Sequence, residues 1–224
     1  MKFVALIALC LPSMADAACR QALALGLDVS GSVDAAEYRL QLDGLATALH
    51  SHAVQELLFL QPAAPISVAV YEWSGPEDQK LILPWTALLG PQDLDRIVTT
   101  LITHQRSEAA PTTAIGSALL TGFSLLRQQS HCWKRTLDVS GDGPANTGPR
   151  PQDIANAAMP DGVIVNGLVI DASNDAELAT YYRSYVIRGP GSFVEVARSF
   201  DDYAAAMERK LLRELQSIAT GALE

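Results

Sequence analysis

Cysteine, histidine and strongly basic stretches are scarce in this sequence. Its 224 residues include three cysteines and four histidines, and the histidines have neither His-x-x-x-His spacing nor cysteines at a ligand spacing. This pattern argues against a zinc site built from nitrogen and sulfur ligands. Lysine and arginine are scattered, and the formal net charge of −9 opposes binding to nucleic acid or anionic lipid. The basic residues Arg209, Lys210 and Arg213 are typical of a solvated helix face.

Long hydrophobic runs and common enzyme motifs are also missing. Beyond the N-terminal segment, no run is long and apolar enough to cross a bilayer, so membrane insertion is not expected. The sequence has no Gly-x-x-x-x-Gly-Lys phosphate loop. Ser30 is not part of a Gly-x-Ser-x-Gly elbow, because Asp28 occupies the position of the first glycine. These absences disfavour P-loop nucleotide hydrolysis and serine-hydrolase chemistry.

The N-terminus has the pattern of a secretory signal peptide. A lysine precedes a short apolar run over residues 3–11, and residues 15–17 form a small-x-small cleavage site. The apolar run is too short for a membrane anchor. We therefore expect a leader over residues 1–17, one domain over residues 18–224, and a periplasmic or secreted location.

Segments with strand character alternate with segments of helical period along the chain. Strands are expected over residues 22–27, 66–73, 79–85, 135–139, 163–170 and 192–197. Helices are expected after residue 34, over 53–60, from 91, from 115, and over 149–158, 176–186 and 201–219. This alternation predicts an α/β fold, a doubly wound and mostly parallel six-stranded sheet with helices on both faces. The turn at residues 74–78 predicts a hairpin, and hence one antiparallel edge strand.

The most informative stretch is Leu-Asp-Val-Ser-Gly-Ser at residues 27–32. An apolar run precedes it, and a capping box from Asp34 follows, so Asp28, Ser30 and Ser32 lie on a strand-to-helix turn. Open parallel sheets bind ligands at such turns. One carboxylate and two hydroxyls, spaced two residues apart, supply the oxygen ligands that suit Mg²⁺, Mn²⁺ or Ca²⁺. The alternative for the serines is helix capping.

These residues resemble the Asp-x-Ser-x-Ser motif of the metal-ion-dependent adhesion site in von Willebrand factor A domains. Thr113-Ala-Ile-Gly116 resembles the family's Thr-x-x-Gly, and Asp142-Gly-Pro-Ala-Asn146 resembles its Asp-Gly-x-x-Asn turn. The wording "DVSGDGPAN" and "RGPGSFV" is similar to a bacterial secreted branch known as DUF1194. The resemblance implies the strand order 3-2-1-4-5-6.

The resemblance also implies a set of site residues. The expected metal-binding residues are Asp28, Ser30, Ser32, Thr113 and Asp142. The expected supporting residues are Asp138, Ser140 and Asn146. Gly141 occupies the position of a family threonine, for which Ser140 is a candidate substitute. Asp138 lies in mid-strand, where a buried carboxylate needs a partner, so it either supports the metal site or pairs with a basic residue such as Arg135.

Two cysteines, Cys19 and Cys132, remain after removal of the leader, an even pair in an exported protein. In the strand order of von Willebrand factor A domains, the strands that follow them are parallel neighbours. The resemblance therefore implies a disulfide at the end of the sheet opposite the metal site. Two separate buried thiols are the alternative.

A divalent ion held mainly by neutral hydroxyls keeps positive charge and an open coordination position, and so attracts a carboxylate from another molecule. The expected function is an exported, divalent-metal-dependent binding module, with Mg²⁺ as the ion, for a protein or peptide with an acidic side chain. A metal-dependent hydrolase or phosphatase is the first alternative, but the nearby loops offer only Arg106 and Arg150 as cations. A scaffold with a vestigial site is the second.

Overall fold

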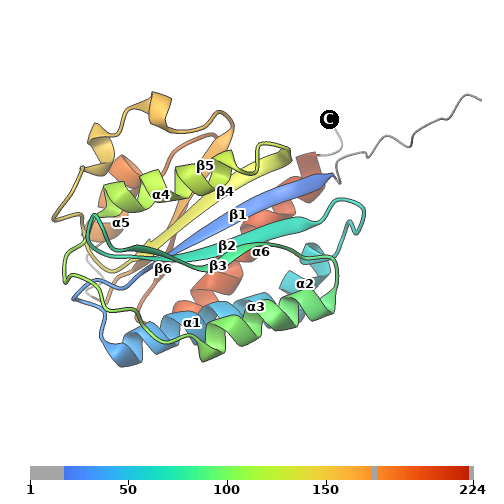
Figure 1. The fold of residues 1–224 in the computed structure, drawn as a ribbon, viewed down its shortest axis with the longest axis horizontal. Coiled ribbons are helices and arrows are strands. Elements are labelled where there is room, and N and C mark those ends of the chain that lie inside the picture. Colours follow the sequence, from blue (N-terminus) through green and yellow to red (C-terminus); the bar gives the residue numbers. More distant parts are fainter. Residues whose placement is uncertain (1–17, 173–175, 222–224) are drawn as a thin grey trace, which may run out of the picture.

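The structure, a computed structural model, describes residues 18–172 and 176–221, and the expected leader over residues 1–17 lies outside them. This part of the chain forms one six-stranded sheet with helices on both faces (Figure 1). The strands are β1 (Cys19–Asp28), β2 (Ile66–Trp73), β3 (Gln79–Ala87), β4 (Cys132–Gly141), β5 (Val163–Ile170) and β6 (Val194–Ala197). Their order, β3-β2-β1-β4-β5-β6, confirms the expected topology.

The centre of the sheet is the pairing of β1 with β2 on one side and β4 on the other, both parallel. Strands β5 and β6 continue in parallel, and β3 pairs antiparallel with β2, which confirms the single antiparallel edge strand. Every residue of β1 and β2 is buried, as expected for strands covered on both faces. The carboxyl ends of β1 and β4 therefore lie side by side.

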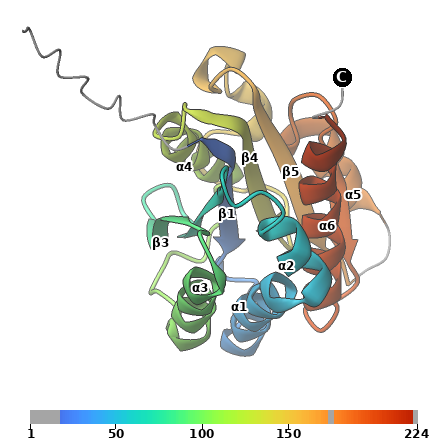
Figure 2. The ribbon, with the colours of Figure 1, turned by 90° about the vertical axis from the view of Figure 1, so that its right-hand side faces the viewer.

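Helices cover both faces of the sheet. They are α1 (Ala35–His50), α2 (His52–Leu58), α3 (Pro91–Thr103), α4 (Ile115–Arg127), α5 (Glu177–Tyr181), a π-helical turn η3 (Tyr182–Val186) and α6 (Tyr203–Gly221). Apolar residues of α1, α3 and α6 form one core cluster with the sheet, and those of α4 and η3 form another on the opposite face. Figures 1 and 2 show α1 and α3 side by side on the face opposite α4. No helix in the described residues is both long and apolar enough to cross a membrane.

The expectation of a helix over residues 149–158 is wrong. The structure has two short 3₁₀ turns instead, η1 (Pro151–Asp153) and η2 (Asn156–Ala158). Arg188 explains the interruption, because its guanidinium donates hydrogen bonds to the carbonyls of Pro151 and Ile154. An α-helix would need those carbonyls for its own ladder.

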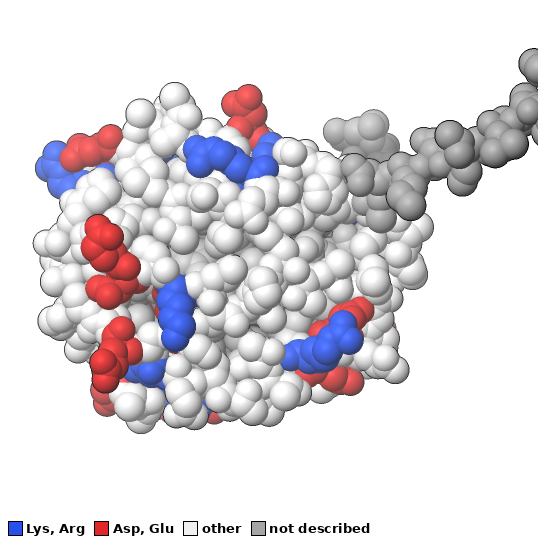
Figure 3. Space-filling model, viewed as in Figure 1, with Lys and Arg blue, Asp and Glu red and all other residues white. Residues whose placement is uncertain are grey.

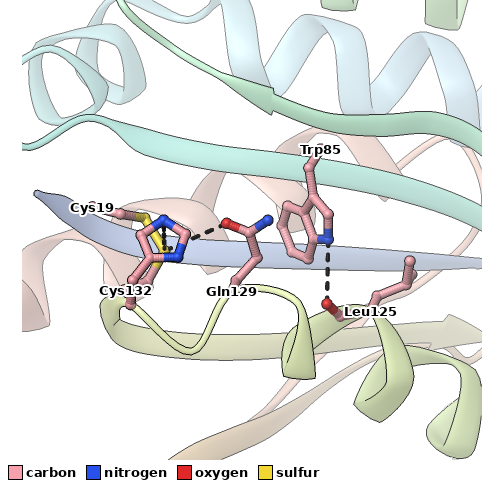
Figure 4. Close-up of a disulfide and its surroundings, with 6 residues drawn as sticks. Cys19, Trp85, Leu125, Gln129 and Cys132 are labelled. Carbon is pink, nitrogen blue, oxygen red and sulfur yellow. Dashed lines mark hydrogen bonds between the residues drawn. A yellow bond between two sulfur atoms is a disulfide. The ribbon is translucent and has the colours of Figure 1, made fainter. Parts of the chain in front are cut away.

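Cys19 and Cys132 form the expected disulfide at the start of β1 and β4 (Figure 4). The two residues are direct partners in the register of the parallel pair, so the sheet itself brings them together. His131 lies beside them, with ligand atoms of all three residues within 4.8 Å of one another. The cysteines are bonded to each other and carry no thiolate, so this group does not form a metal site.

Candidate metal-binding site

Asp28 is the last residue of β1, and its side chain is fully buried. Its Oδ1 accepts a hydrogen bond of 2.7 Å from the backbone amide of Ser30. The Ser30 hydroxyl lies 3.2 Å from the Ser32 hydroxyl, and Gln41 of α1 donates to the Asp28 carbonyl at 3.0 Å. The turn is thus fixed by its own side chains and by the following helix.

Asp142 joins this group from the loop after β4. The Ser32 hydroxyl donates to Asp142 Oδ1 at 2.7 Å, although the two residues are 110 positions apart in the sequence. The parallel pairing of β1 with β4 explains the contact, since both strands end at the same edge of the sheet. Asp28, Ser30, Ser32 and Asp142 therefore form one connected group of polar atoms.

Thr113, in the loop before α4, contacts Asn146 in the loop after β4. The Thr113 amide donates to Asn146 Oδ1 at 2.8 Å, and the Asn146 side-chain amide donates to the Thr113 hydroxyl at 3.4 Å. Gly31 packs against Pro111 so closely that a Cβ at position 31 would lie 2.6 Å from the Pro111 Cβ. The loop before α4 thus touches both the Asp28 turn and the loop after β4, and the three loops meet.

Arg106 contacts the backbone of the Asp28 turn. Its guanidinium donates to the carbonyls of Val29 at 2.8 Å and Ser30 at 3.2 Å. Arg150, the other cation expected near the site, pairs with Asp153 at the surface. Only the first of the two expected cations therefore contacts the candidate site.

The surroundings of Asp28 disfavour the ionised form of its carboxyl group. Its pKa is raised to about 7: burial raises it most, hydrogen bonds from Ser30 lower it, the charge of Asp142 raises it, and the backbone of Asp142 lowers it. Asp28 Oδ2 is buried and has no hydrogen-bond partner among the described residues. A buried carboxylate oxygen without a partner is unfavourable when ionised.

Two aromatic side chains that the sequence did not indicate lie beside this oxygen. The Tyr182 hydroxyl and the Trp73 indole nitrogen are also buried without partners among the described residues. A Cβ at position 141 would lie 2.6 Å from the Tyr182 hydroxyl and 3.0 Å from Asp28 Oδ2. Gly141 therefore leaves room for Tyr182, which explains why glycine occupies the position of the family threonine. Only the fold reveals this, because Tyr182 comes from η3.

Two expected supporting residues face elsewhere. The Ser140 hydroxyl donates to the Gly26 carbonyl at 3.2 Å and lies 3.3 Å from the Tyr203 hydroxyl of α6. Asp138 pairs with Lys210 of α6, rather than with Arg135 or the metal-site group. Asp138 and Ser140 are two positions apart on β4. Because side chains along a strand alternate between the two faces of the sheet, both lie on the face that α6 covers.

The donor set fits a divalent cation. It contains the carboxylates of Asp28 and Asp142 and the hydroxyls of Ser30 and Ser32, oxygen ligands that suit Mg²⁺, Mn²⁺ or Ca²⁺. The Thr113 hydroxyl, also expected in this set, contacts Asn146. The unpartnered, buried Asp28 oxygen is the observation that favours this fit. A nearby positive charge would stabilise its ionised form.

Comparisons with solved structures show the fold. Proximal thread matrix protein 1 from the mussel byssus matches with a TM-score of 0.65 at 16% identity, over 90% of this chain and 49% of that chain. The same protein with a zinc-occupied MIDAS motif matches at 0.62 and 17%, over 90% and 49%. The vWF domain of the type V pili tip protein Mfa5 from Porphyromonas gingivalis matches at 0.59 and 9%, over 93% and 98%. The chain thus spans about half the length of the mussel protein.

The sequence comparisons are more specific. No curated protein sequence matches the chain. The profile of a family described as "Protein of unknown function (DUF1194)" matches residues 18–219, nearly the whole described structure. With its von Willebrand factor A-like fold, this chain belongs to the DUF1194 family.

Proposed function

We propose that this protein is an exported, divalent-metal-dependent binding module that engages an acidic side chain of a protein or peptide partner. The proposed metal-binding residues are Asp28, Ser30, Ser32, Thr113 and Asp142. The observation that carries the proposal is the buried Asp28 carboxylate, which has an unpartnered oxygen and is connected through the two serines to Asp142.

The electrostatics of the group support the proposal. Two carboxylates lie close enough for Asp142 to raise the pKa of Asp28, and burial raises it more. A bound divalent cation would reverse this balance, because opposite charge favours the ionised carboxylate. When bound, the ion supplies positive charge and an exchangeable coordination position for an incoming carboxylate. Mg²⁺ is the proposed ion, with Mn²⁺ and Ca²⁺ as alternatives.

The relatives support a binding role and an extracytoplasmic location. One similar structure is that of a mussel byssus protein with a zinc-occupied MIDAS motif, and another is a domain of a pili tip protein. The proposed periplasmic or secreted location rests on the leader pattern at residues 1–17.

The decisive experiment compares wild type with Asp28→Ala in a thermal unfolding assay with Mg²⁺ and with chelator. We expect Mg²⁺ to stabilise the wild type by about 2.7 kcal/mol at a hundred times the dissociation constant. Asp28→Ala should stay folded and lose this response. The control is Asp95→Ala, an exposed carboxylate on α3, which should keep it. An identical Mg²⁺ response of wild type and Asp28→Ala would refute the site.

Two further measurements separate the alternatives. Turnover of generic phosphate or carboxylic esters in Mg²⁺ that is lost in Asp28→Ala would identify a metal-dependent hydrolase. An intact fold that binds none of the three ions would leave a scaffold with a vestigial site.

A further inference from the structure

A cavity of about 700 Å³ opens beside the candidate metal site. It lies between the first turn of α1, the loop after β4, the end of β5, α5 and the loop before α6. Five carboxylates line it: Glu37, Asp142, Asp171, Glu177 and Asp201. We call this cavity the acidic groove. Asp142 belongs both to the groove and to the candidate metal site.

The charged side chains that line the acidic groove are all acidic among the described residues. No lysine, arginine or histidine lines it in the part of the chain that the structure describes. On the face drawn in Figure 3, the end of the molecule where β1 finishes carries acidic side chains with basic side chains beside them. A cleft lined by charges of one sign concentrates ions of the opposite sign. A purely acidic partner would therefore be repelled beside the metal, whereas a partner carrying a cation would be attracted.

Apolar side chains also line the acidic groove. Leu40, Leu178 and the rings of Tyr181 and Phe200 line it together with the carboxylates. Lysine and arginine bury their aliphatic stems against apolar surface and keep the charged head at a polar rim. Their cationic heads also bind to aromatic faces. The combination of apolar and acidic side chains in one lining thus matches the chemistry of these two side chains.

We propose that the acidic groove binds a lysine or arginine side chain from the same partner segment whose acidic side chain meets the metal. This inference rests on the proposed function. A cavity of 700 Å³ is roughly 9 Å across, about three residues of extended chain. The recognised segment therefore carries Asp or Glu within about three residues of Lys or Arg.

The test uses the full chain, fluorescently labelled, on a random heptapeptide array in Mg²⁺ and in chelator. Wild type should select peptides that contain both an acidic and a basic residue, and only in Mg²⁺. Replacing the basic residue of a selected peptide by glutamine should weaken binding about fivefold.

The matched variants remove two negative charges each. Glu37→Gln/Asp201→Asn neutralises the groove, and glutamine preserves the capping box at the start of α1. Glu56→Gln/Asp95→Asn neutralises two exposed carboxylates on α2 and α3. We expect the first variant to lose the selection for lysine and arginine while it keeps Mg²⁺-dependent selection for acidic residues, and the second to behave as wild type.

The outcomes separate the two proposals. If wild type selects acidic peptides in Mg²⁺ without a basic residue, or if selection for lysine and arginine survives in the groove variant, the groove is overturned and the metal site is left intact. Selection of basic residues that needs no Mg²⁺ and is lost in the groove variant overturns the proposed function and the joint motif. An array without selection overturns both.

Discussion

At the scale of single residues, Asp28 couples folding to pH. Its carboxyl group has a pKa of about 7 in the folded protein, against about 3.9 in an unfolded chain. Between these values the folded state binds more protons than the unfolded state, so the free energy of unfolding falls as pH rises from about 4 to about 7. For a shift of three pKa units the loss is about 4 kcal/mol.

We therefore expect metal-free protein to be less stable at pH 8 than at pH 5, and Asp28→Asn to reduce this difference. The measurement is urea unfolding in chelator across that range. Burial also raises the pKa of Asp138, so the difference between wild type and variant is what isolates Asp28. Added Mg²⁺ should restore wild-type stability at pH 8. An equal change in the free energy of unfolding with pH in wild type and Asp28→Asn would contradict this prediction.

The clustering of Asp28, Ser30 and Ser32 could be predicted from the sequence because their spacing is local, whereas the approach of Asp142 was expected only from the family resemblance. Asp28, Ser30 and Ser32 share one turn, and the structure connects them to Asp142 as expected. The roles of Tyr182 and Gly141 could not be predicted, because they depend on the approach of η3 to the end of β4. Sequence spacing carries no information about such contacts.

At the scale of elements, a buried ionic cluster fixes α6 on the sheet. Lys210 is fully buried and contacts Asp138 of β4 and Glu214 one turn further along α6. Asn166 of β5 donates to Glu214 at 2.6 Å. The expectation of a solvated helix face is wrong for Lys210. Its partner Asp138 is distant in the sequence, so the amphipathic pattern of α6 alone could not reveal the pair.

Lys210→Met should therefore be strongly destabilising. The methionine fills a similar volume but removes the ammonium group that contacts both buried carboxylates, which costs about 3–5 kcal/mol. Chemical denaturation at neutral pH measures the change. The control on the same helix is Arg209→Met, which breaks an exposed pair with Glu195 and should change stability by less than about 1 kcal/mol. Equal losses in both variants would mean that the cluster does not hold α6.

At the scale of the whole molecule, the pairing of β1 with β4 organises both ends of the sheet. At one end it joins Cys19 to Cys132, and at the other it brings Asp28 toward Asp142. The sequence alone predicts the alternation of strands and helices, but it does not show that β4, which is not the next strand in the chain, pairs with β1. The family resemblance supplied that strand order, and the structure confirms it.

The disulfide should therefore support stability without controlling metal binding. It joins residues 113 positions apart, and on the chain-entropy model such a loop stabilises the fold by about 4–5 kcal/mol. Cys19→Ser/Cys132→Ser in protein lacking residues 1–17 should unfold at markedly lower denaturant concentration, and reduction of the wild type should have the same effect.

The disulfide lies at the opposite end of β1 from Asp28, and sites this far apart usually act independently. The Mg²⁺ affinity of the folded variant should therefore stay within about twofold of the wild-type affinity. Two reactive thiols in the native wild type would disprove the bond, and a large loss of Mg²⁺ affinity would show that the two ends of the sheet are coupled.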